Sequence, residues 1–168
     1  MCYSFHFKHA DDVVAHLNRL VPSLTDPFLK SKYAGFVSVA AVTVYEMAIK
    51  EIFICFARKK HKVLGNFTES YFDRINGRIK LKVLKDDYIP RFGKKYKDRF
   101  CKHLDQRVRE YLIANGRDIT TSYGNLIVWR NAFAHQGSVP SSVTFEEVVQ
   151  AYKDGKEVIH CLAKCMTR

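Results

Sequence analysis

The fold of this chain is decided by residues 31–62, which read SKYAGFVSVAAVTVYEMAIKEIFICFARKKHK. Apolar side chains recur there every three or four residues, as at Val37 and Ala41, and this is the spacing of one face of an α-helix. Much of the opposite face is apolar too, which predicts a long central helix surrounded by other helices. Charges such as Glu46 and Lys50 in its middle are costly inside a lipid bilayer. The stretch therefore predicts a buried core helix, no membrane span and no membrane partner.

The segments on either side of the central helix carry helical patterns as well. We expect a first helix that opens at Asp11 and Asp12, where acidic side chains favour a helix N-terminus. Gly65 is expected to end the central helix, and Asn66 to cap the next one. Apolar side chains at helical spacing then predict helices over 94–115, 120–136 and 145–166.

Two shorter patterns complete this outline. Residues 77–85, GRIKLKVLK, alternate as in a β-strand, but a lone strand would be an exposed edge, so we expect helix or irregular structure there. Thr144 and Glu147 have the spacing of a capping box at the start of the last helix. The prediction is an all-α bundle of about five to six helices around one long apolar helix, in a single domain of residues 1–168.

The composition narrows the class of protein. With 168 residues, 47% of them hydrophobic, the chain has the material for a core, and only 8 Gly and 4 Pro argue against a many-stranded sandwich. Cys161 and Cys165 could share a helix face, but the second pair of a zinc site is missing. We therefore expect reduced thiols, no metal and no cofactor. The first residues, MCYSFHFKHADD, lack the pattern of a signal peptide, which predicts a cytoplasmic protein.

The positive charge is concentrated in one third of the chain. Segment 58–109 holds 17 of the 28 Lys and Arg but only 6 of the 17 Asp and Glu, so it carries the whole net charge of +11. Such a segment favours phosphate-rich partners, and we predict RNA or DNA. Lys94, Lys95 and Lys97 are our candidates for phosphate contact. The aromatic side chains between the basic residues are at helical spacing, which assigns most of them to the core.

Reactive side-chain types gather most densely in WRNAFAHQG, residues 129–137. His135 can exchange protons near neutral pH, and Arg130 can bind phosphate through two hydrogen bonds at once. Asn131 lies one helical turn before His135. Arg130 and His135 point about 140° apart on an ideal helix. A loosened helix end, a long reach by Arg130 or a second copy of the chain could bring both to one phosphate.

The pattern R-N-x-x-x-H-x-G at residues 130–137 resembles the motif of the HEPN superfamily of small all-α proteins. The order of elements is similar too, with a long apolar helix first and the motif on a short helix before a last amphipathic one. The stretch DYIPRFGKKYKDRF, residues 87–100, is similar to the middle of one bacterial HEPN group. Some HEPN proteins carry a tyrosine two residues after the histidine as a modification site, and Gly137 stands there in this chain.

The resemblance implies a metal-independent endoribonuclease of toxin–antitoxin or antiphage-defence systems. Arg130 would then stabilise charge on the phosphate, His135 would act as general acid or base, and Asn131 would hold His135 or the phosphate in place. The Arg and His of two subunits would line a shared cleft in a homodimer, alongside an antitoxin or other defence partner. Glu46 either forms an ion pair with Lys50 or reaches Arg130 or His135.

Two alternatives stay open at this point. The chain could be a non-catalytic HEPN-like module that binds RNA or a nucleotide, or a helical interaction protein whose charge serves solubility. Arg130 and His135 could also be an ordinary surface arginine and a histidine that interacts with the helix dipole. For the dimer contact we expect contributions from Ile127, Val128 and Phe133.

Overall fold

The computed structural model describes residues 3–166, and every regular element in that range is helical. The α-helices are α1 (Phe7–Leu20), α2 (Pro27–Lys60), α3 (Lys62–Phe72), α4 (Leu81–Val83), α5 (Lys94–Asn115), α6 (Ile119–Gln136) and α7 (Phe145–Met166). A π-helical segment, Leu84–Tyr88, and a 3-10 segment, Ile89–Phe92, join α4 to the loop before α5. The all-α prediction is confirmed, and six of these α-helices in the described range are longer than one turn.

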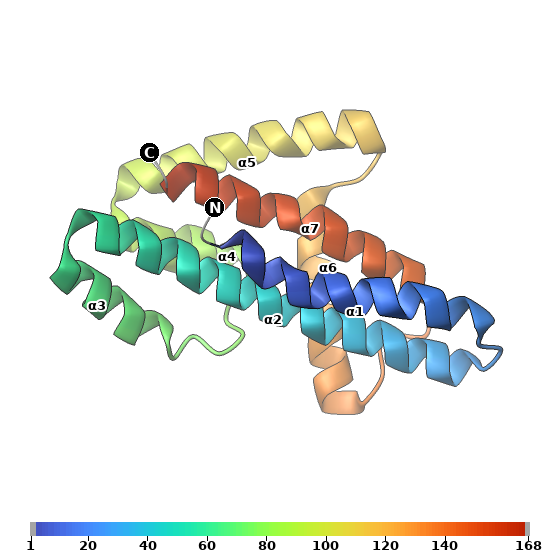
Figure 1. The fold of residues 1–168 in the computed structure, drawn as a ribbon. Coiled ribbons are helices and arrows are strands. Elements are labelled where there is room, and N and C mark those ends of the chain that lie inside the picture. The colour runs from blue at the N-terminus through green and yellow to red at the C-terminus, as the bar shows by residue number, and fades with distance from the viewer. Residues whose placement is uncertain (1–2, 167–168) are drawn as a thin grey trace.

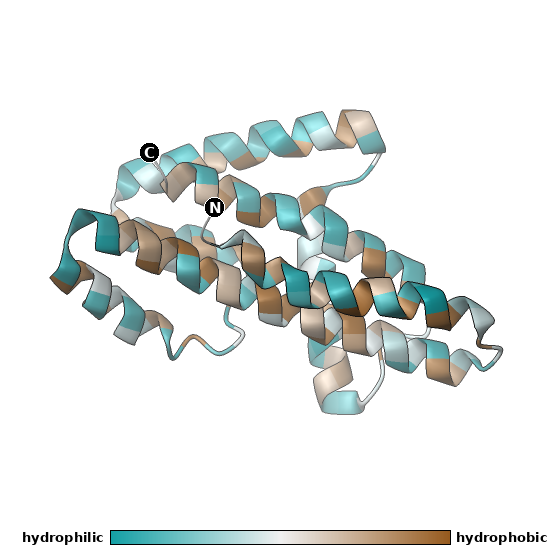
Figure 2. Cartoon of the chain, viewed as in Figure 1, coloured by the Kyte–Doolittle hydropathy of each residue, from teal (hydrophilic) through white to brown (hydrophobic). Residues whose placement is uncertain are grey.

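The helices pack around α2, the longest element (Figure 1). α1 and α7 run along α2, α3 folds back beside its C-terminal end, and α6 crosses both α2 and α7. Figure 2 shows that the middle of α2 is hydrophobic, whereas α5 is hydrophilic along most of its length. α5 accordingly buries only Tyr96, Phe100 and Leu104. α5, at the C-terminal end of the basic segment 58–109, therefore lies on the outside of a core built on α2.

The start of α1 and the α2–α3 junction differ from the sequence prediction. α1 begins at Phe7, before Asp11, because Phe7 is buried and extends the apolar face of the helix. α2 ends at Lys60, and the imidazole of His61 accepts the Val63 N–H to cap α3. Gly65 does not stop a helix but lies within α3. A Cβ at Gly65 would come 2.5 Å from Cγ of Arg58, so this glycine permits close packing of α3 on α2.

The other predicted ends are present. Gly116 and Gly137 follow α5 and α6 in the left-handed conformation that favours glycine. Thr144 and Glu147 form the capping box reciprocally: the Thr144 N–H donates to the Glu147 carboxylate and the Glu147 N–H to the Thr144 hydroxyl. Residues 77–85 contain a loop and the single turn of α4, as expected for helix or irregular structure. Within residues 3–166, no helix combines the length and apolar character needed to cross a bilayer.

Candidate active site at the end of α6

The C-terminal half of α6 is held against the first part of α2. Gly35 of α2 lies under the ring of Phe133, which any Cβ at this position would overlap. One turn earlier on α2, the Lys32 ammonium donates to the Gly137 carbonyl at 2.5 Å. A cation at the end of a helix also complements the helix dipole. These contacts fix the end of α6, which carries residues 130–137.

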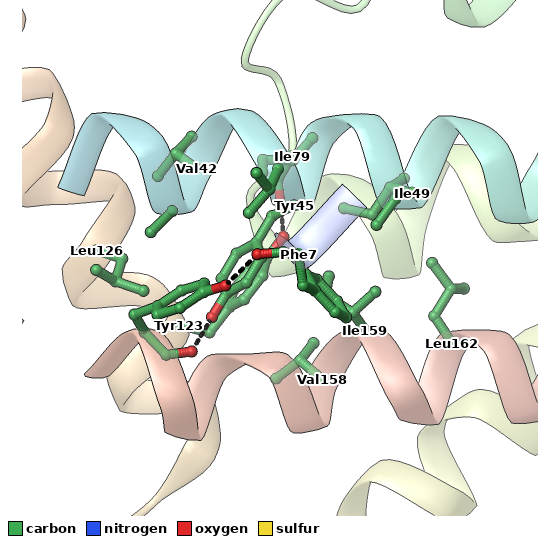
Figure 3. Close-up of a cluster of buried hydrophobic side chains, with 14 of the residues drawn as sticks. Phe7, Val42, Tyr45, Ile49, Ile79, Tyr123, Leu126, Val158, Ile159 and Leu162 are labelled. Atoms are coloured by element: carbon green, nitrogen blue, oxygen red, sulfur yellow. Dashed lines mark hydrogen bonds between the residues drawn. The ribbon is translucent and has the colours of Figure 1, made fainter. Parts of the chain in front are cut away.

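The loop between α3 and α4 reaches the same helix. The Gly77 N–H donates to Glu46 Oε2 at 2.5 Å, and the hydroxyl of buried Tyr123 on α6 donates to the Ile79 carbonyl at 2.6 Å (Figure 3). Gly77 has a φ of +75°, and a Cβ there would lie only 3.0 Å from Nη2 of Arg130. Because glycine has no side chain, the Arg130 guanidinium can lie against the backbone of this loop at Gly77.

Glu46 joins the site through the loop rather than by touching the motif. Its carboxylate forms an ion pair with Lys50 at 2.9 Å while also accepting the Gly77 N–H. Both side chains of the pair are mostly buried. Within residues 3–166, Glu46 makes no hydrogen bond to Arg130 or His135. Its negative charge thus holds the backbone on which Arg130 lies, and Lys50 balances that charge.

Within the described residues, no hydrogen bond joins Arg130 to His135. Nη1 of Arg130 donates to Oδ1 of Asn131 at 3.0 Å, so Asn131 orients the arginine and not the histidine. His135 lies in the last turn of α6, is exposed to solvent, and has no hydrogen-bond partner among the described residues. One chain thus holds a restrained guanidinium and a solvent-exposed imidazole with no hydrogen bond between them in the described residues.

The predicted phosphate-binding lysines differ from one another. Lys94 and Lys95 are exposed at the start of α5, and the Lys95 ammonium lies 5.0 Å from the centre of the Tyr96 ring. Lys97 is paired with Asp86 at 3.1 Å, which offsets part of its charge. Tyr96 itself is buried, in agreement with its assignment to the core.

Sequence reasoning missed Lys32 and Gly77. Nothing near Lys32 in the sequence indicates that it caps α6, because the two are 105 residues apart. Gly77 follows Asn76, and an Asn-Gly pair is a strong turn signal that could have drawn attention to it. The expected dimer contact also needs correction: Ile127 is 3% exposed and faces the core, whereas Val128 is 59% exposed.

The C-terminal cysteines belong to the core. Burial raises the pKa of Cys161 and of Cys165 to about 11, which keeps both as neutral thiols near pH 7. Cys165 donates to the Tyr96 carbonyl at 3.0 Å. In the part of the chain that the structure describes, no three His, Cys, Asp or Glu side chains form a group suited to a metal ion.

Comparison of the sequence with known protein families identifies a relationship that does not depend on the geometry of the site. Residues 7–168 match the family described as RiboL-PSP-HEPN, which covers all the α-helices described above. No curated protein and no solved structure matches the chain significantly. The family match extends over nearly the whole sequence, and the chain therefore belongs to the RiboL-PSP-HEPN family of HEPN domains.

Proposed function

We propose that the chain is a single HEPN domain, residues 1–168, that acts as a metal-independent endoribonuclease. The observation that carries this proposal is the pairing of a restrained Arg130 with a solvent-accessible His135 at the end of α6. Arginine is suited to phosphate and histidine to proton transfer at neutral pH. The net charge of +11 supports RNA as the substrate.

The reaction uses the ribose of the substrate as the nucleophile. His135 takes the proton of the 2′-OH, and the 2′-oxygen forms a bond to the adjacent phosphorus. The bond from phosphorus to the 5′-oxygen breaks, and this oxygen takes a proton from a protonated histidine. Arg130 binds the phosphate oxygens, on which charge develops. The products are a 2′,3′-cyclic phosphate and a 5′-OH end.

Cleavage of single-stranded RNA in excess EDTA tests the reaction. The expected result is cleavage that continues with the chelator present, with His135→Ala slowing it by roughly 10² or more. His103→Ala, at a histidine on α5 outside the motif, is the control. Activity that disappears with EDTA, or that survives His135→Ala, contradicts the proposal.

A homodimer would complete the site. One chain offers a single exposed His135, whereas acid and base roles call for two histidines. Phe36 on α2 is 54% exposed, and its ring centre lies 5.5 Å from that of Phe133, so exposed apolar surface adjoins the motif. A second copy that covers this surface about a two-fold axis would bring two motifs face to face.

Phe36→Glu tests the dimer, because a charge on that surface opposes burial. We expect a monomer by analytical ultracentrifugation and loss of most cleavage. Ile113→Glu, at a position 88% exposed on α5, should leave both unchanged. If the unaltered protein is monomeric at assay concentration with constant activity per chain on dilution, no shared site exists.

The second candidate function is a non-catalytic HEPN-like module that binds RNA or a nucleotide. The observation in its favour is the lack of any hydrogen-bond partner for His135 in the described chain, since catalytic histidines are usually oriented by one. RNA binding without cleavage by the dimer would establish it. As an endoribonuclease, the protein would act in the cytoplasm as a toxin or antiphage effector, held in check by an antitoxin or another partner protein.

A further inference from the structure

α3 separates two clefts on the surface of the protein. The first, of about 460 Å³, lies between α3, the end of α2 and the start of α5, and it is lined by aromatic rings that include Phe56, Phe92 and Tyr96. The second, of about 410 Å³, lies between α3 and the π-helical segment Leu84–Tyr88. Phe67 and Tyr71 of α3 line both clefts. The two clefts thus meet at a pair of aromatic rings.

Uncompensated positive charge surrounds these clefts. Lys60 and Lys95 line the first cleft, and Arg74 and Arg78 line the second. Within residues 3–166 none of these four side chains has an ion-pair partner. Nearby basic residues do: Arg58 pairs with Glu69, Arg91 with Asp87 and Lys97 with Asp86. Arg91 lines the first cleft and Asp87 the second, and the two neutralise each other, so the charge left on the cleft walls is that of the four unpaired cations. This charge makes the clefts complementary to an anionic ligand.

Phe67 is the most exposed of the aromatic side chains in the clefts. It is 70% exposed and packs against no other ring in the described part of the chain. The contact between α3 and α2 is made instead by buried residues such as Phe72, whose ring stacks on that of Phe53. An aromatic face open to water between unpaired cations has the chemistry of a base-stacking platform.

One wall residue of the second cleft is next in sequence to the candidate active site. Arg78, on its wall, follows Gly77, and the guanidinium of Arg130 lies on Gly77. A polyanion that runs along α3 from Lys60 past Phe67 to Arg78 would therefore end one residue from the glycine that Arg130 contacts.

We propose that α3 and its two clefts form a track for single-stranded RNA, in which a base stacks on Phe67 while Lys60, Lys95, Arg74 and Arg78 contact phosphates. The Tyr71 ring is already covered by the Arg91 guanidinium, 4.7 Å from the ring centre. The inference rests on the proposed function, because it assigns this track to the substrate of that site. Stacking requires unpaired bases, so the track selects single-stranded over double-stranded RNA.

Equilibrium binding of a fluorescent single-stranded RNA oligonucleotide tests the track apart from catalysis. All variants carry His135→Ala, so that binding is measured whether or not the protein cleaves RNA. Phe67→Ala should weaken binding about tenfold or more, while Phe67→Trp should retain it. Arg74→Gln with Arg78→Gln should lower the slope of log K against log salt by up to about 1.4. Ile113→Ala and Lys153→Gln are matched controls on α5 and α7, both exposed.

Several outcomes would overturn the track. In the first, the Phe67→Ala variant binds RNA as tightly as its parent. In the second, duplex RNA binds as tightly as single-stranded RNA. In the third, AMP or polyglutamate displaces RNA when its phosphate or carboxylate groups are present at the same concentration as the RNA phosphates. Any of them leaves the proposed reaction standing if the His135-containing protein cleaves RNA. Conversely, a protein that binds through Phe67 but does not cleave retains the track and loses the nuclease.

Discussion

Asp154 on α7 and Arg130 on α6 are charged side chains on two helices that pack together, yet the chain surrounds them in opposite ways. Asp154 is fully buried and accepts hydrogen bonds from Tyr111 at 2.7 Å, Arg117 at 2.8 Å and Gln150 at 2.7 Å. Arg130 is half-buried and, within the described residues, makes one side-chain hydrogen bond, to Asn131. A guanidinium has five N–H donors, so most of those of Arg130 remain available.

This difference separates a polar group that holds the fold from one suited to a ligand. The donors around Asp154 come from α5, the α5–α6 loop, α6 (the Ser122 hydroxyl at 3.2 Å) and α7, and they join these four parts of the chain. A buried carboxylate without hydrogen-bond donors would be costly, and water does not reach Asp154, so the protein itself has to supply the donors. Arg130 and His135, by contrast, have side-chain hydrogen-bonding groups that the described residues leave unused.

Replacing the two arginines should sharpen this comparison most. Arg130→Ala is expected to slow RNA cleavage by about 10²-fold or more, because it removes charge stabilisation at the phosphate, with little change in thermal stability. Arg117→Ala should do the reverse: the melting temperature falls because Asp154 loses a donor, and the rate per folded molecule persists. Cleavage assays and thermal unfolding of both variants provide the measurement. Equal loss of activity in the two, with both folded, would break the distinction.

The glycine under Arg130 offers a smaller effect with a matched control. Gly77 and Gly116 both have positive φ, but only Gly77 contacts Arg130, and nothing lies within 4 Å of a Cβ at Gly116. Alanine at either position should cost about 1–2 kcal/mol of stability through the backbone. Gly77→Ala should in addition displace the guanidinium and lower cleavage by up to about 10²-fold.

Urea unfolding and cleavage kinetics of the two variants separate these effects. Gly116→Ala should show the stability loss alone. If Gly77→Ala also keeps the parent rate, the position of Arg130 on the loop does not matter for activity.

The smallest effect concerns pH. Burial opposes ionisation of Asp154, but hydrogen bonds from Arg117, Tyr111 and Gln150 outweigh it and hold its pKa below the ordinary value. A lowered pKa adds stability above the ordinary carboxyl pKa of about 4, and this stability disappears as pH falls further. The urea concentration at the midpoint of unfolding should therefore decrease as the pH is lowered below about 5. The decrease should be less steep in Asp154→Asn than in the parent.

Asp105→Asn, at an exposed carboxylate of α5, serves as the control and should keep the parent profile. Asp154→Asn should also be less stable at pH 7, by about 1–3 kcal/mol, because its amide replaces an acceptor oxygen with a donor that faces other donors. Identical acid profiles for parent and Asp154→Asn would show that this carboxylate does not control acid stability.

Much of the fold could be predicted because helical periodicity is a local property. The apolar spacing in α2 and α5, the Thr144–Glu147 capping box and the glycines after α5 and α6 each involve residues within a few positions of one another. The prediction failed at Gly65, where a glycine that usually ends a helix instead makes room for Arg58 of the neighbouring helix. That requirement comes from packing between helices, which local spacing does not contain.

The candidate site divides along the same line. Arg130, Asn131 and His135 could be selected from the sequence because they form one short motif whose side-chain chemistry suits RNA, and the concentration of basic residues in 58–109 is likewise a property of the sequence. The tertiary structure alone decided that Arg130 lies on Gly77, that Glu46 holds that loop and that Lys32 caps α6. These partners are 31 to 105 residues apart along the chain, and only the packing of α6 and of the α3–α4 loop against α2 brings them into contact.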